Sequence, residues 1–312
     1  MTNKSFFIKS YGCQMNEYDS EKITSLLLKD GYSNSNDINE ADLIVFNTCN
    51  IRDKAAQKVY SDIGRVTKKN SDKTIALVGC VAQAENEEIF KKNKYVDIVL
   101  GPQSYHLLPK MIDAHNEYQK KQINTDFIIN EKFDFIHEEK SPKGVSSYIT
   151  IQEGCDKFCA FCVVPFTRGP EYSRSVINIV EETKSLLNRG TREIVLLGQN
   201  VNAYSYTDEM SMTYNISKLI DEISKLDDVK RIRYTTSHPN NMDHELMRLH
   251  GSNEKLMPFL HLPVQSGSNE ILKNMNRKYT VDEYKKIIDN LKDYCPNIEI
   301  SSDFIIGFPG ET

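Results

Sequence analysis

The chain is organised around the stretch Gly154-Cys155-Asp156-Lys157-Phe158-Cys159-Ala160-Phe161-Cys162. Its three cysteines have the spacing C-x₃-C-x₂-C and follow the strand-like run Ser147–Ile151. A short loop of this kind can bring three thiolates onto one face of an iron–sulfur cluster, which normally takes four cysteine ligands. Three local ligands therefore leave one iron open to a small ligand that chelates through an amine and a carboxylate.

A structural zinc site is the alternative for these cysteines. Such sites normally use four protein ligands in C-x₂-C pairs, and the chain has no second pair of this kind. The spacing therefore favours an iron–sulfur cluster over zinc or a chance grouping. An aromatic residue before the last cysteine, here Phe161, makes the stretch resemble the radical S-adenosylmethionine (SAM) signature, and the resemblance places Phe161 among the cofactor-binding residues.

Length and composition set the broad class. A chain of 312 residues predicts two domains of about 100–200 residues each, and 39% hydrophobic with 27% charged residues is enough for ordinary globular cores. The net charge of −5 does not indicate a nucleic-acid binder. Seven cysteines in a chain of this length favour metal ligation over a disulfide framework.

The sequence leads us to expect no targeting signal. The apolar run Phe6-Phe7-Ile8 is too short for a signal peptide. No run approaches the roughly 20 apolar residues of a membrane span. We therefore expect a cytoplasmic protein that does not associate with a membrane.

Strand and helix patterns alternate in the first half of the chain. This alternation predicts an α/β fold with a doubly wound, mostly parallel sheet. The expected strands are 6–10, 43–46, 75–78 and 96–100, and the expected helices are 17–29, 52–69, 85–92 and 106–115.

Three further cysteines follow three of these strands. Cys13, Cys49 and Cys80 lie 36 and 31 residues apart (13 to 49 and 49 to 80), which is about one βα unit each. Open α/β sheets place their ligand crevice just outside the carboxyl ends of the strands. The positions predict a second cluster with three thiolate ligands; three buried structural cysteines are the alternative.

The polar segments near residues 118–122 and 138–144, the latter broken by Pro142 and Gly144, predict an interdomain linker. We therefore expect a first domain over residues 1–118, a linker over 119–144 and a second domain over 145–312.

The second half predicts five further βα units, with strands at 147–151, 193–197, 231–236, 259–262 and 298–306. Such a series fits a partial (β/α) barrel, whose active site forms at the carboxyl ends of the strands. Polar residues at these ends are candidates for binding SAM, although loop capping is an equally good role for any one of them. They are Gln199, Asn200, Ser237, Gln265 and Ser266.

Taken together, the chain is similar to the methylthiotransferase family of radical SAM enzymes, and within it to the MiaB type. The resemblance runs over essentially the whole chain. It rests on the strings Tyr11–Ser20, Asn47–Cys49, Gly154–Pro165, Leu197–Asn202 and His261–Ser268.

The resemblance implies two [4Fe-4S] clusters. One would be held by Cys155, Cys159 and Cys162, with SAM on its open iron; the other, held by Cys13, Cys49 and Cys80, would carry the sulfur to be delivered. One SAM would methylate that sulfur, and a second would be cleaved to a 5′-deoxyadenosyl radical. The implied reaction places a methylthio group on carbon 2 of N(6)-dimethylallyl (isopentenyl) adenosine in the anticodon loop of tRNA.

The resemblance also implies which partners the protein has and that family members are longer than this chain. The partners are tRNA and an electron donor that the sequence does not identify, and we expect a monomer. Family members continue with a sixth barrel strand and an RNA-binding (TRAM) domain, whereas this sequence stops at Gly310-Glu311-Thr312. We therefore expect a truncated chain with an incomplete barrel.

Two other function classes stay open. One is a sibling methylthiotransferase that acts on threonylcarbamoyl-adenosine in tRNA or on a ribosomal-protein aspartate. The string Gln14–Tyr18 favours the isopentenyl-adenosine type over this sibling. The other is a non-catalytic iron–sulfur or zinc-binding protein.

Overall fold

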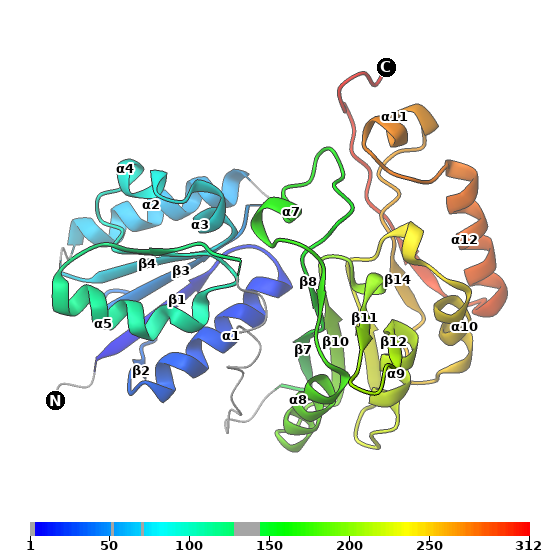
Figure 1. Cartoon of the computed structure of the whole chain (residues 1–312), viewed down its shortest axis with the longest axis horizontal. Helices are drawn as coiled ribbons and strands as arrows, with labels where there is room; N and C mark the ends of the chain where they lie inside the picture. Colours follow the sequence, from blue (N-terminus) through cyan, green and yellow to red (C-terminus); the bar gives the residue numbers. More distant parts are fainter. Residues whose placement is uncertain (1–3, 51–52, 70–71, 128–143) are drawn as a thin grey trace. The chain divides into compact units, whose positions relative to one another are not determined.

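The computed structural model describes residues 4–50, 53–69, 72–127 and 144–312. The chain divides into two compact units (Figure 1). The first unit comprises Met1–Glu139 together with Phe166–Gly169, and the second comprises Lys140–Pro165 together with Pro170–Thr312.

The first unit contains a six-stranded sheet in which every pair of neighbouring strands is parallel. Its order is β2-β1-β3-β4-β5-β6. Central strands such as β3 are buried along their whole length, which is why they read as continuous apolar runs. The strands are β1 (Ser5–Ser10), β2 (Ser33–Asn34), β3 (Leu43–Thr48), β4 (Thr74–Gly79), β5 (Ile98–Leu100) and β6 (Gln122–Asn124).

Helices cover both faces of this sheet, which confirms the predicted doubly wound α/β fold (Figure 1). Alternate residues of β3 point to opposite faces: Leu43 and Val45 pack with α1 (Gln14–Lys29) and α5 (Leu108–Tyr118). Ile44 and Phe46 pack with residues of the other face. The helices there are α2 (Asp53–Lys69), α3 (Cys80–Glu85) and α4 (Glu88–Lys92).

The strand order reverses at β1, which has β2 on one side and β3 on the other. The chain leaves β1 for α1 on one face and leaves β3 for α2 on the other face. A crevice opens at such a switch point, outside the carboxyl ends of the strands. Cys13 and Cys49 stand directly after these two strands.

The structure also contains elements that the sequence patterns did not predict. The edge strands β2 and β6 have only two and three residues, too few to show a periodicity. Strand β6 falls within the expected linker 119–144, because residues 122–124 pair with β5. Residues 128–143 of that linker lie outside the described residues.

The second unit is built from parallel strands in a βα series, as predicted for a partial barrel. Strands β7 (Ser146–Thr150), β10 (Glu193–Leu197) and β13 (Arg231–Tyr234) form one sheet. Strands β14 (Phe259–His261) and β15 (Glu299–Ser301) pair with each other. Two short antiparallel pairs lie outside this series: β8 (Gln152–Glu153) with β9 (Tyr172–Ser173), and β11 (Ser205–Thr207) with β12 (Thr213–Asn215).

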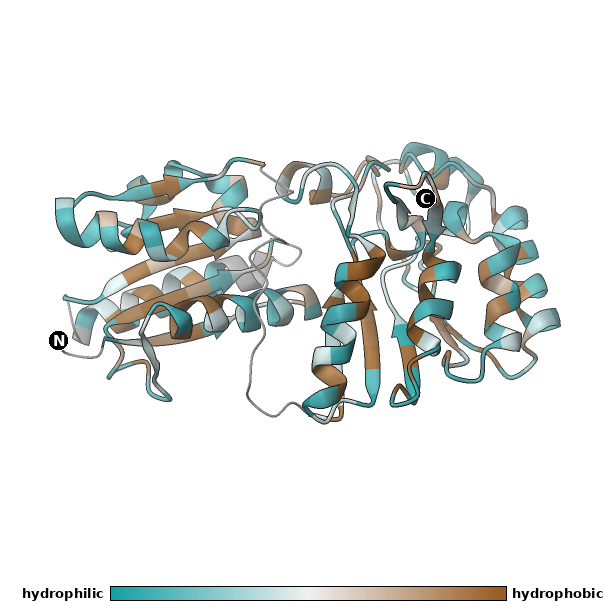
Figure 2. Cartoon of the chain, turned by 60° about the horizontal axis from the view of Figure 1, so that its bottom comes forward, coloured by the Kyte–Doolittle hydropathy of each residue, from teal (hydrophilic) through white to brown (hydrophobic). Residues whose placement is uncertain are grey.

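Helices alternate with these strands and bury their apolar sides against them, as the brown faces in Figure 2 show. Five of these helices begin at a residue whose side chain accepts a hydrogen bond from a backbone N–H of the first turn. They are α8 (Val176–Asn188), α9 (Ile216–Ser224), α10 (His244–Ser252), α11 (Asn269–Asn274) and α12 (Val281–Tyr294). The short helix α7 (Val164–Thr167) follows the cysteine loop.

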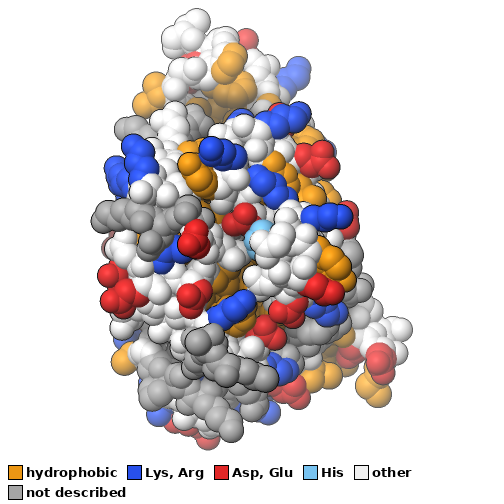
Figure 3. Space-filling model, turned by 90° about the vertical axis from the view of Figure 1, so that its left-hand side faces the viewer, with side chains coloured by type: hydrophobic (Ala, Val, Ile, Leu, Met, Phe, Trp, Pro, Cys, Tyr) orange, Lys and Arg blue, Asp and Glu red, His pale blue; other side chains and the backbone are white. Residues whose placement is uncertain are grey.

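Charged side chains of both signs intermingle on the face shown in Figure 3. Two lysines of α4 form ion pairs: Lys91 pairs with Glu88 of the same helix at 2.6 Å, and Lys92 pairs with Glu85 at the end of α3 at 2.9 Å. These contacts are those of a solvated helix face. No helix among the described residues is both long enough and apolar enough to span a membrane.

Candidate metal centres

The first candidate centre lies at the carboxyl ends of three neighbouring strands. Cys13 follows β1 and is the N-cap of α1, Cys49 follows β3, and Cys80 is the first residue of α3. Cys49 and Cys80 are buried, Cys13 is half-buried, and none of the three is in a disulfide. The structure therefore places the three predicted ligands at the carboxyl ends of neighbouring strands of one sheet.

Two glycines allow these strand ends to approach each other closely. A Cβ atom on Gly12 would lie 2.2 Å from the Cβ of Cys49, and Gly12 has a φ of +119°. A Cβ atom on Gly79, which has a φ of +93°, would lie 2.5 Å from the carbonyl oxygen of Thr48. Only glycine meets both requirements without strain.

Asn16 joins the loops that carry Cys13 and Cys49. Its side chain is fully buried, and its Nδ2 donates to the carbonyl oxygens of Tyr11 (3.1 Å) and Thr48 (2.8 Å). Its Oδ1 lies 3.5 Å from the Cys13 sulfur. Because a buried amide with satisfied hydrogen bonds holds one arrangement, the loops are fixed before any ligand binds.

The charge around this centre favours a thiolate at Cys13. A hydrogen bond with Cys49 lowers the pKa of Cys13 to about 6, and the positive charge of Arg168 acts in the same direction against the effect of burial. Arg168 belongs to the segment Phe166–Gly169, which is part of the first unit. Its guanidinium forms an ion pair with Asp19 at 2.9 Å, and both side chains are only 3% exposed.

The second candidate centre is the loop after β8. Cys159 is buried, whereas Cys155 and Cys162 are half-buried. Burial raises the pKa of Cys155 to about 11 and also raises the pKa of Cys162. Without a bound metal, these two thiols are therefore protonated at neutral pH.

The segment between α11 and α12 holds the second cysteine loop in place. The backbone N–H of Ala160 donates to the carbonyl oxygen of Met275 at 3.0 Å. Asn276 Nδ2 donates to the carbonyl oxygens of Lys157 (3.2 Å) and Phe158 (2.8 Å). Arg277, on the same segment, donates from Nη1 to the Cys159 sulfur at 3.4 Å.

Three of the predicted SAM-binding residues lie at the ends of β10 and β13. Gln199 Oε1 accepts from the N–H of Gly154 at 2.7 Å, beside Cys155. The Oδ1 of Asn200 and the Oγ of Ser237 are buried and have no hydrogen-bond partner among the described residues. Since buried polar atoms are nearly always satisfied, such atoms are expected where a polar ligand binds.

The other predicted SAM-binding residues have mainly loop contacts. Ser266 Oγ accepts from the N–H of Ser268 at 3.1 Å, and the backbone of Gln265 bonds with Asp303 and Ile305. Gln265 has a φ of +73°. Phe161 is 39% exposed on the cysteine loop. The contact of Ser266 with Ser268 is the loop-capping contact that the sequence offered as the alternative.

Among the described residues, no group of three or more His, Cys, Asp or Glu side chains surrounds one metal-ion position. A four-iron cluster takes each thiolate through a different iron, so its cysteines stand farther apart than the ligands of a single ion. The donors at both centres are cysteine thiols, which is the chemistry that iron–sulfur clusters use. Both sets of residues therefore fit a cluster.

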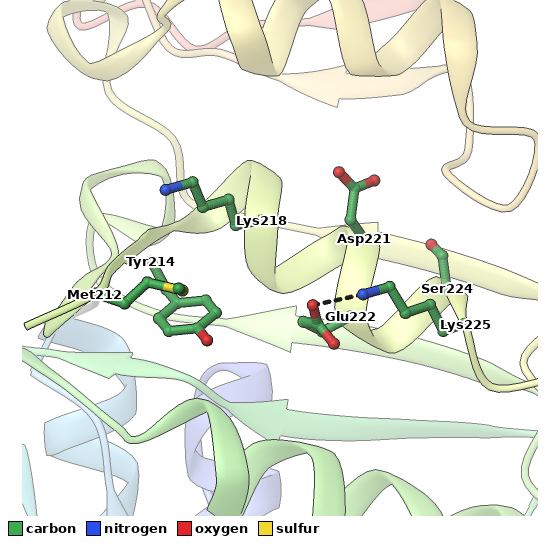
Figure 4. Close-up of a pocket in the computed structure, with 7 residues that line it drawn as sticks. All are labelled: Met212, Tyr214, Lys218, Asp221, Glu222, Ser224 and Lys225. Atoms are coloured by element: carbon green, nitrogen blue, oxygen red, sulfur yellow. Dashed lines mark hydrogen bonds and ion pairs between the residues drawn. The ribbon is translucent and has the colours of Figure 1, made fainter. Parts of the chain in front are cut away.

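A separate pocket of about 550 Å³ in the second unit is lined by residues of β12 and α9 and the positions directly beside them (Figure 4). Lys225 pairs there with Glu222 at 2.7 Å. Its lining comes from residues 212–225 and includes none of the strand-end residues predicted to bind SAM.

Comparison with known proteins gives a match to each unit. Residues 5–101 match the model of the uncharacterized protein family UPF0004, and residues 149–312 match that of the Radical SAM superfamily. A protein of Rickettsia conorii named tRNA-2-methylthio-N(6)-dimethylallyladenosine synthase is 50% identical over 99% of this chain and 72% of its own length. A Jannaschia protein of the same name is 51% identical over 99% of this chain and 67% of its own length.

The chain belongs to the radical SAM methylthiotransferase family, MiaB type. This membership confirms the predicted family and the prediction of a radical SAM enzyme.

Solved structures share the fold of this methylthiotransferase. The radical SAM methyltransferase TsrM from Kitasatospora setae, solved with cobalamin and a [4Fe-4S] cluster, superposes with a TM-score of 0.68 at 14% identity, over 100% of this chain and 71% of TsrM. The cobalamin-dependent SAM radical enzyme OxsB, solved with aqua-cobalamin and SAM, superposes with a TM-score of 0.64 at 13% identity. That match covers 98% of this chain and 49% of OxsB.

Sequence patterns missed several residues of this methylthiotransferase that contact the cysteines or charge their surroundings. They are Asp19, Arg168, Glu171 and Arg277. Arg277 is 118 residues from Cys159 in sequence, and only the fold reveals such a contact. The one available signal was that Arg168 and Glu171 follow the last cysteine closely in the string Thr167-Arg168-Gly169-Pro170-Glu171.

Proposed function

We propose that this protein transfers a methylthio group to carbon 2 of N(6)-dimethylallyl (isopentenyl) adenosine beside the anticodon of tRNA. The single observation that supports this most is the 50% identity, over 99% of the chain, to relatives named for that product. Two separate centres of three cysteines agree with a reaction that needs both a radical source and a sulfur carrier.

Cys155, Cys159 and Cys162 are the proposed ligands of the [4Fe-4S] cluster that binds SAM. Asn200 Oδ1 and Ser237 Oγ, which are buried and unbonded among the described residues, are the proposed contacts of SAM. Thr236, directly before Ser237, is a β-branched residue with a φ of +72°. Backbone strain of this kind is often retained because it orients a functional group.

Cys13, Cys49 and Cys80 are the proposed ligands of a second [4Fe-4S] cluster, which carries the sulfur. The hydrogen bonds of Asn16 and the close contact between Gly12 and Cys49 fix the loops that carry Cys13 and Cys49. The low pKa of Cys13 keeps its sulfur ready for metal at neutral pH.

The cofactors are needed to break the C–H bond at carbon 2 of the adenine. An unactivated aromatic C–H bond is not acidic enough for a side-chain base to remove its proton. When bound, the cofactors supply one-electron chemistry that amino-acid side chains lack. The described residues of the chain hold the ligands, exclude water from the buried thiols and orient the loops. The target adenine must leave its stack, and this costs least in a single-stranded anticodon loop.

The remaining assignments belong to the same proposal. An N-terminal methylthiotransferase domain over residues 1–118, together with β6, carries the sulfur centre, and the linker follows β6. A radical SAM domain over residues 145–312, apart from Phe166–Gly169, carries the radical centre. The protein works in the cytoplasm as a monomer and takes electrons from a separate donor.

Mass spectrometry of tRNA nucleosides tests the proposal. Cells that lack the protein should contain isopentenyl-adenosine without its methylthio group, and the gene supplied in trans should restore the modified nucleoside. Complementation by a Cys49→Ala version serves as the control and should fail. Full methylthiolation of tRNA in the deletion strain, or loss of a modification only from a ribosomal protein, would overturn the assignment.

A further inference from the structure

Arg277 is a buried cation beside the second cysteine centre. It lies between α11 and α12, and its side chain is 8% exposed. Its Nη1 is 3.4 Å from the Cys159 sulfur, and its Nη2 donates to the carbonyl oxygen of Pro263 at 3.0 Å. Its Nε donates to the hydroxyl of Tyr279 at 2.9 Å. Each nitrogen of the guanidinium therefore has a partner, and one partner is a cysteine sulfur.

Tyr279 fixes the position of this guanidinium. Its hydroxyl accepts from Arg277 and donates to the carbonyl oxygen of Val264 at 2.7 Å. The guanidinium carbon lies 5.1 Å from the centre of the Tyr279 ring, within the range of a cation–π contact. The orientation toward Cys159 is thus determined by the protein and does not require a bound cofactor.

The three partners of Arg277 leave its charge without a carboxylate among the described residues. The other buried arginines differ in this respect: Arg168 pairs with Asp19 at 2.9 Å, and Arg174 pairs with Glu182 at 2.8 Å. Burying a cation is costly unless a negative group compensates it. The group that Arg277 contacts is Cys159, which is negative as a metal-bound thiolate.

Neighbouring titratable groups do not supply the missing negative charge. Burial, together with the nearby charges of Arg277 and Lys157, lowers the pKa of His238 to about 3, so this ring is neutral at physiological pH. Burial raises the pKa of Tyr279, so its hydroxyl also stays neutral. The positive charge of Arg277 is therefore directed at the cysteine centre.

We propose that Arg277 is a positioning residue that donates a hydrogen bond to the Cys159 sulfur and raises the reduction potential of the cluster held by Cys155, Cys159 and Cys162. This inference rests on the ligand set of the proposed function. Reduction adds one electron from an external one-electron donor and makes or breaks no bond, so the reduced cluster is more negative. A nearby cation and a hydrogen bond to sulfur both stabilise that state, and such contacts are known to set cluster potentials.

A potentiometric titration tests this directly. The protein carries Cys13→Ala, Cys49→Ala and Cys80→Ala, so that one cluster is present after anaerobic reconstitution. Dithionite is the reductant, and the reduced cluster is followed by electron paramagnetic resonance. In this background Arg277→Gln should change the reduction equilibrium at least tenfold toward the oxidised form, a shift of about −59 mV for one electron.

Two further variants distinguish the effect of the contact between Arg277 and Cys159 from the effect of any nearby positive charge on the reduction potential. Lys278→Gln is the matched control: it removes one positive charge at the next position, where the side chain is exposed. It should leave the potential unchanged. Arg277→Lys keeps the charge but loses the contacts of the guanidinium, and its shift should lie between the two. An unchanged potential in Arg277→Gln, or an equal shift in Lys278→Gln, would overturn the inference.

A spectroscopic measurement decides the case in which Arg277→Gln fails to retain a cluster. The same background with Arg277 intact is labelled with [¹⁵N]arginine and examined by electron–nuclear double resonance. A ¹⁵N coupling to the reduced cluster is expected, and no coupling would overturn the inference. Absence of any four-iron cluster in this background would overturn the ligand set as well, whereas a cluster with an unchanged potential would overturn the role of Arg277 alone.

Discussion

The two cysteine centres are assembled in opposite ways. Cys155, Cys159 and Cys162 lie in one loop of eight residues, whereas Cys13, Cys49 and Cys80 are spread over three strand ends. The loop is held by contacts with Gln199 and with residues 275–277. The first centre exists only when β1, β3 and β4 pair in register. The difference teaches that the ligands of one centre are brought together by local sequence, whereas those of the other are brought together only by the folding of a whole sheet.

The centres also differ in charge. The arginine at the first centre is neutralised by Asp19, whereas the arginine at the second centre has no carboxylate partner among the described residues. Cys13 has a lowered pKa, and Cys155 and Cys162 have raised ones. Two clusters of the same type would thus meet different electrostatic surroundings.

The largest expected effect comes from removing one ligand at each centre. Cys159→Ala should abolish the reductive cleavage of SAM and therefore all product. Cys49→Ala should leave cleavage to 5′-deoxyadenosine and abolish methylthio transfer. Both products are measured by mass spectrometry after anaerobic incubation with dithionite and isopentenylated tRNA. Methylthiolated product from the Cys49→Ala protein would contradict the claim that the first centre delivers the sulfur while the second generates the radical.

Removing the carboxylate of Asp19 should destabilise the first unit by about 3–5 kcal/mol, because the buried guanidinium of Arg168 would lose its partner. Hydrogen exchange of the β1 and β3 amides measures this in Asp19→Asn, since exchange reports each unit separately. Glu88→Gln, which breaks an exposed pair with Lys91, is the control and should leave exchange unchanged. Equal exchange in Asp19→Asn and the unsubstituted protein would contradict the account.

A methyl group on Gly12 should disrupt the first centre alone. In Gly12→Ala the new Cβ would collide with Cys49, and the residue would keep a positive φ. We expect the first unit to lose roughly 2–4 kcal/mol of stability and the protein to lose the cluster held by Cys13, Cys49 and Cys80. The iron content measures the loss of the cluster, and hydrogen exchange measures the loss of stability. Gly64→Ala in α2 is the matched control, because nothing lies within 4 Å of its Cβ position, and it should be stabilising by about 0.5–1 kcal/mol. Full iron content in Gly12→Ala would refute the close contact.

Acid should weaken the second unit, and one buried histidine, His250, should account for a measurable part of the effect. His250 is buried, its Nε2 is 2.6 Å from the Tyr234 hydroxyl, and burial lowers its pKa from 6.5 to about 4. The unfolded chain therefore binds the proton more tightly, so this stability is complete above pH 6.5 and is lost as the pH falls toward 4. His250 should contribute about 1.4 kcal/mol per pH unit to the slope of stability against pH.

Hydrogen exchange of β10 and β13 amides between pH 7 and pH 5, corrected for intrinsic exchange, measures this slope. His250→Gln lacks the titrating ring and should show a shallower slope by that amount. The amides of β3 in the first unit serve as the internal reference. Identical slopes in the two proteins would show that His250 does not carry the effect.

Sequence patterns predicted the alternation of strands and helices well, because the buried strands β3 and β4 are continuous apolar runs. They also placed Cys13, Cys49 and Cys80 at strand ends, which the structure confirms. The edge strands β2 and β6 were missed because two or three half-exposed residues carry no pattern.

The surroundings of the centres could not be predicted in the same way. The contacts of Arg277 with Cys159 and of Arg168 with Asp19 join residues more than a hundred positions apart. Buried polar atoms such as Asn200 Oδ1 are recognised only after the burial of each atom is known. Ligand types can be read from sequence, whereas the charges that tune them depend on the folded chain.

Iron and sulfide counting tests the central claim most directly, namely that the chain holds two separate clusters with three cysteine ligands each. The unsubstituted protein should bind about eight irons after anaerobic reconstitution, as two four-iron clusters require. The triple alanine variant of Cys13, Cys49 and Cys80 and that of Cys155, Cys159 and Cys162 should each bind about four. About four irons in the unsubstituted protein, or stoichiometric zinc in place of iron, would contradict the account.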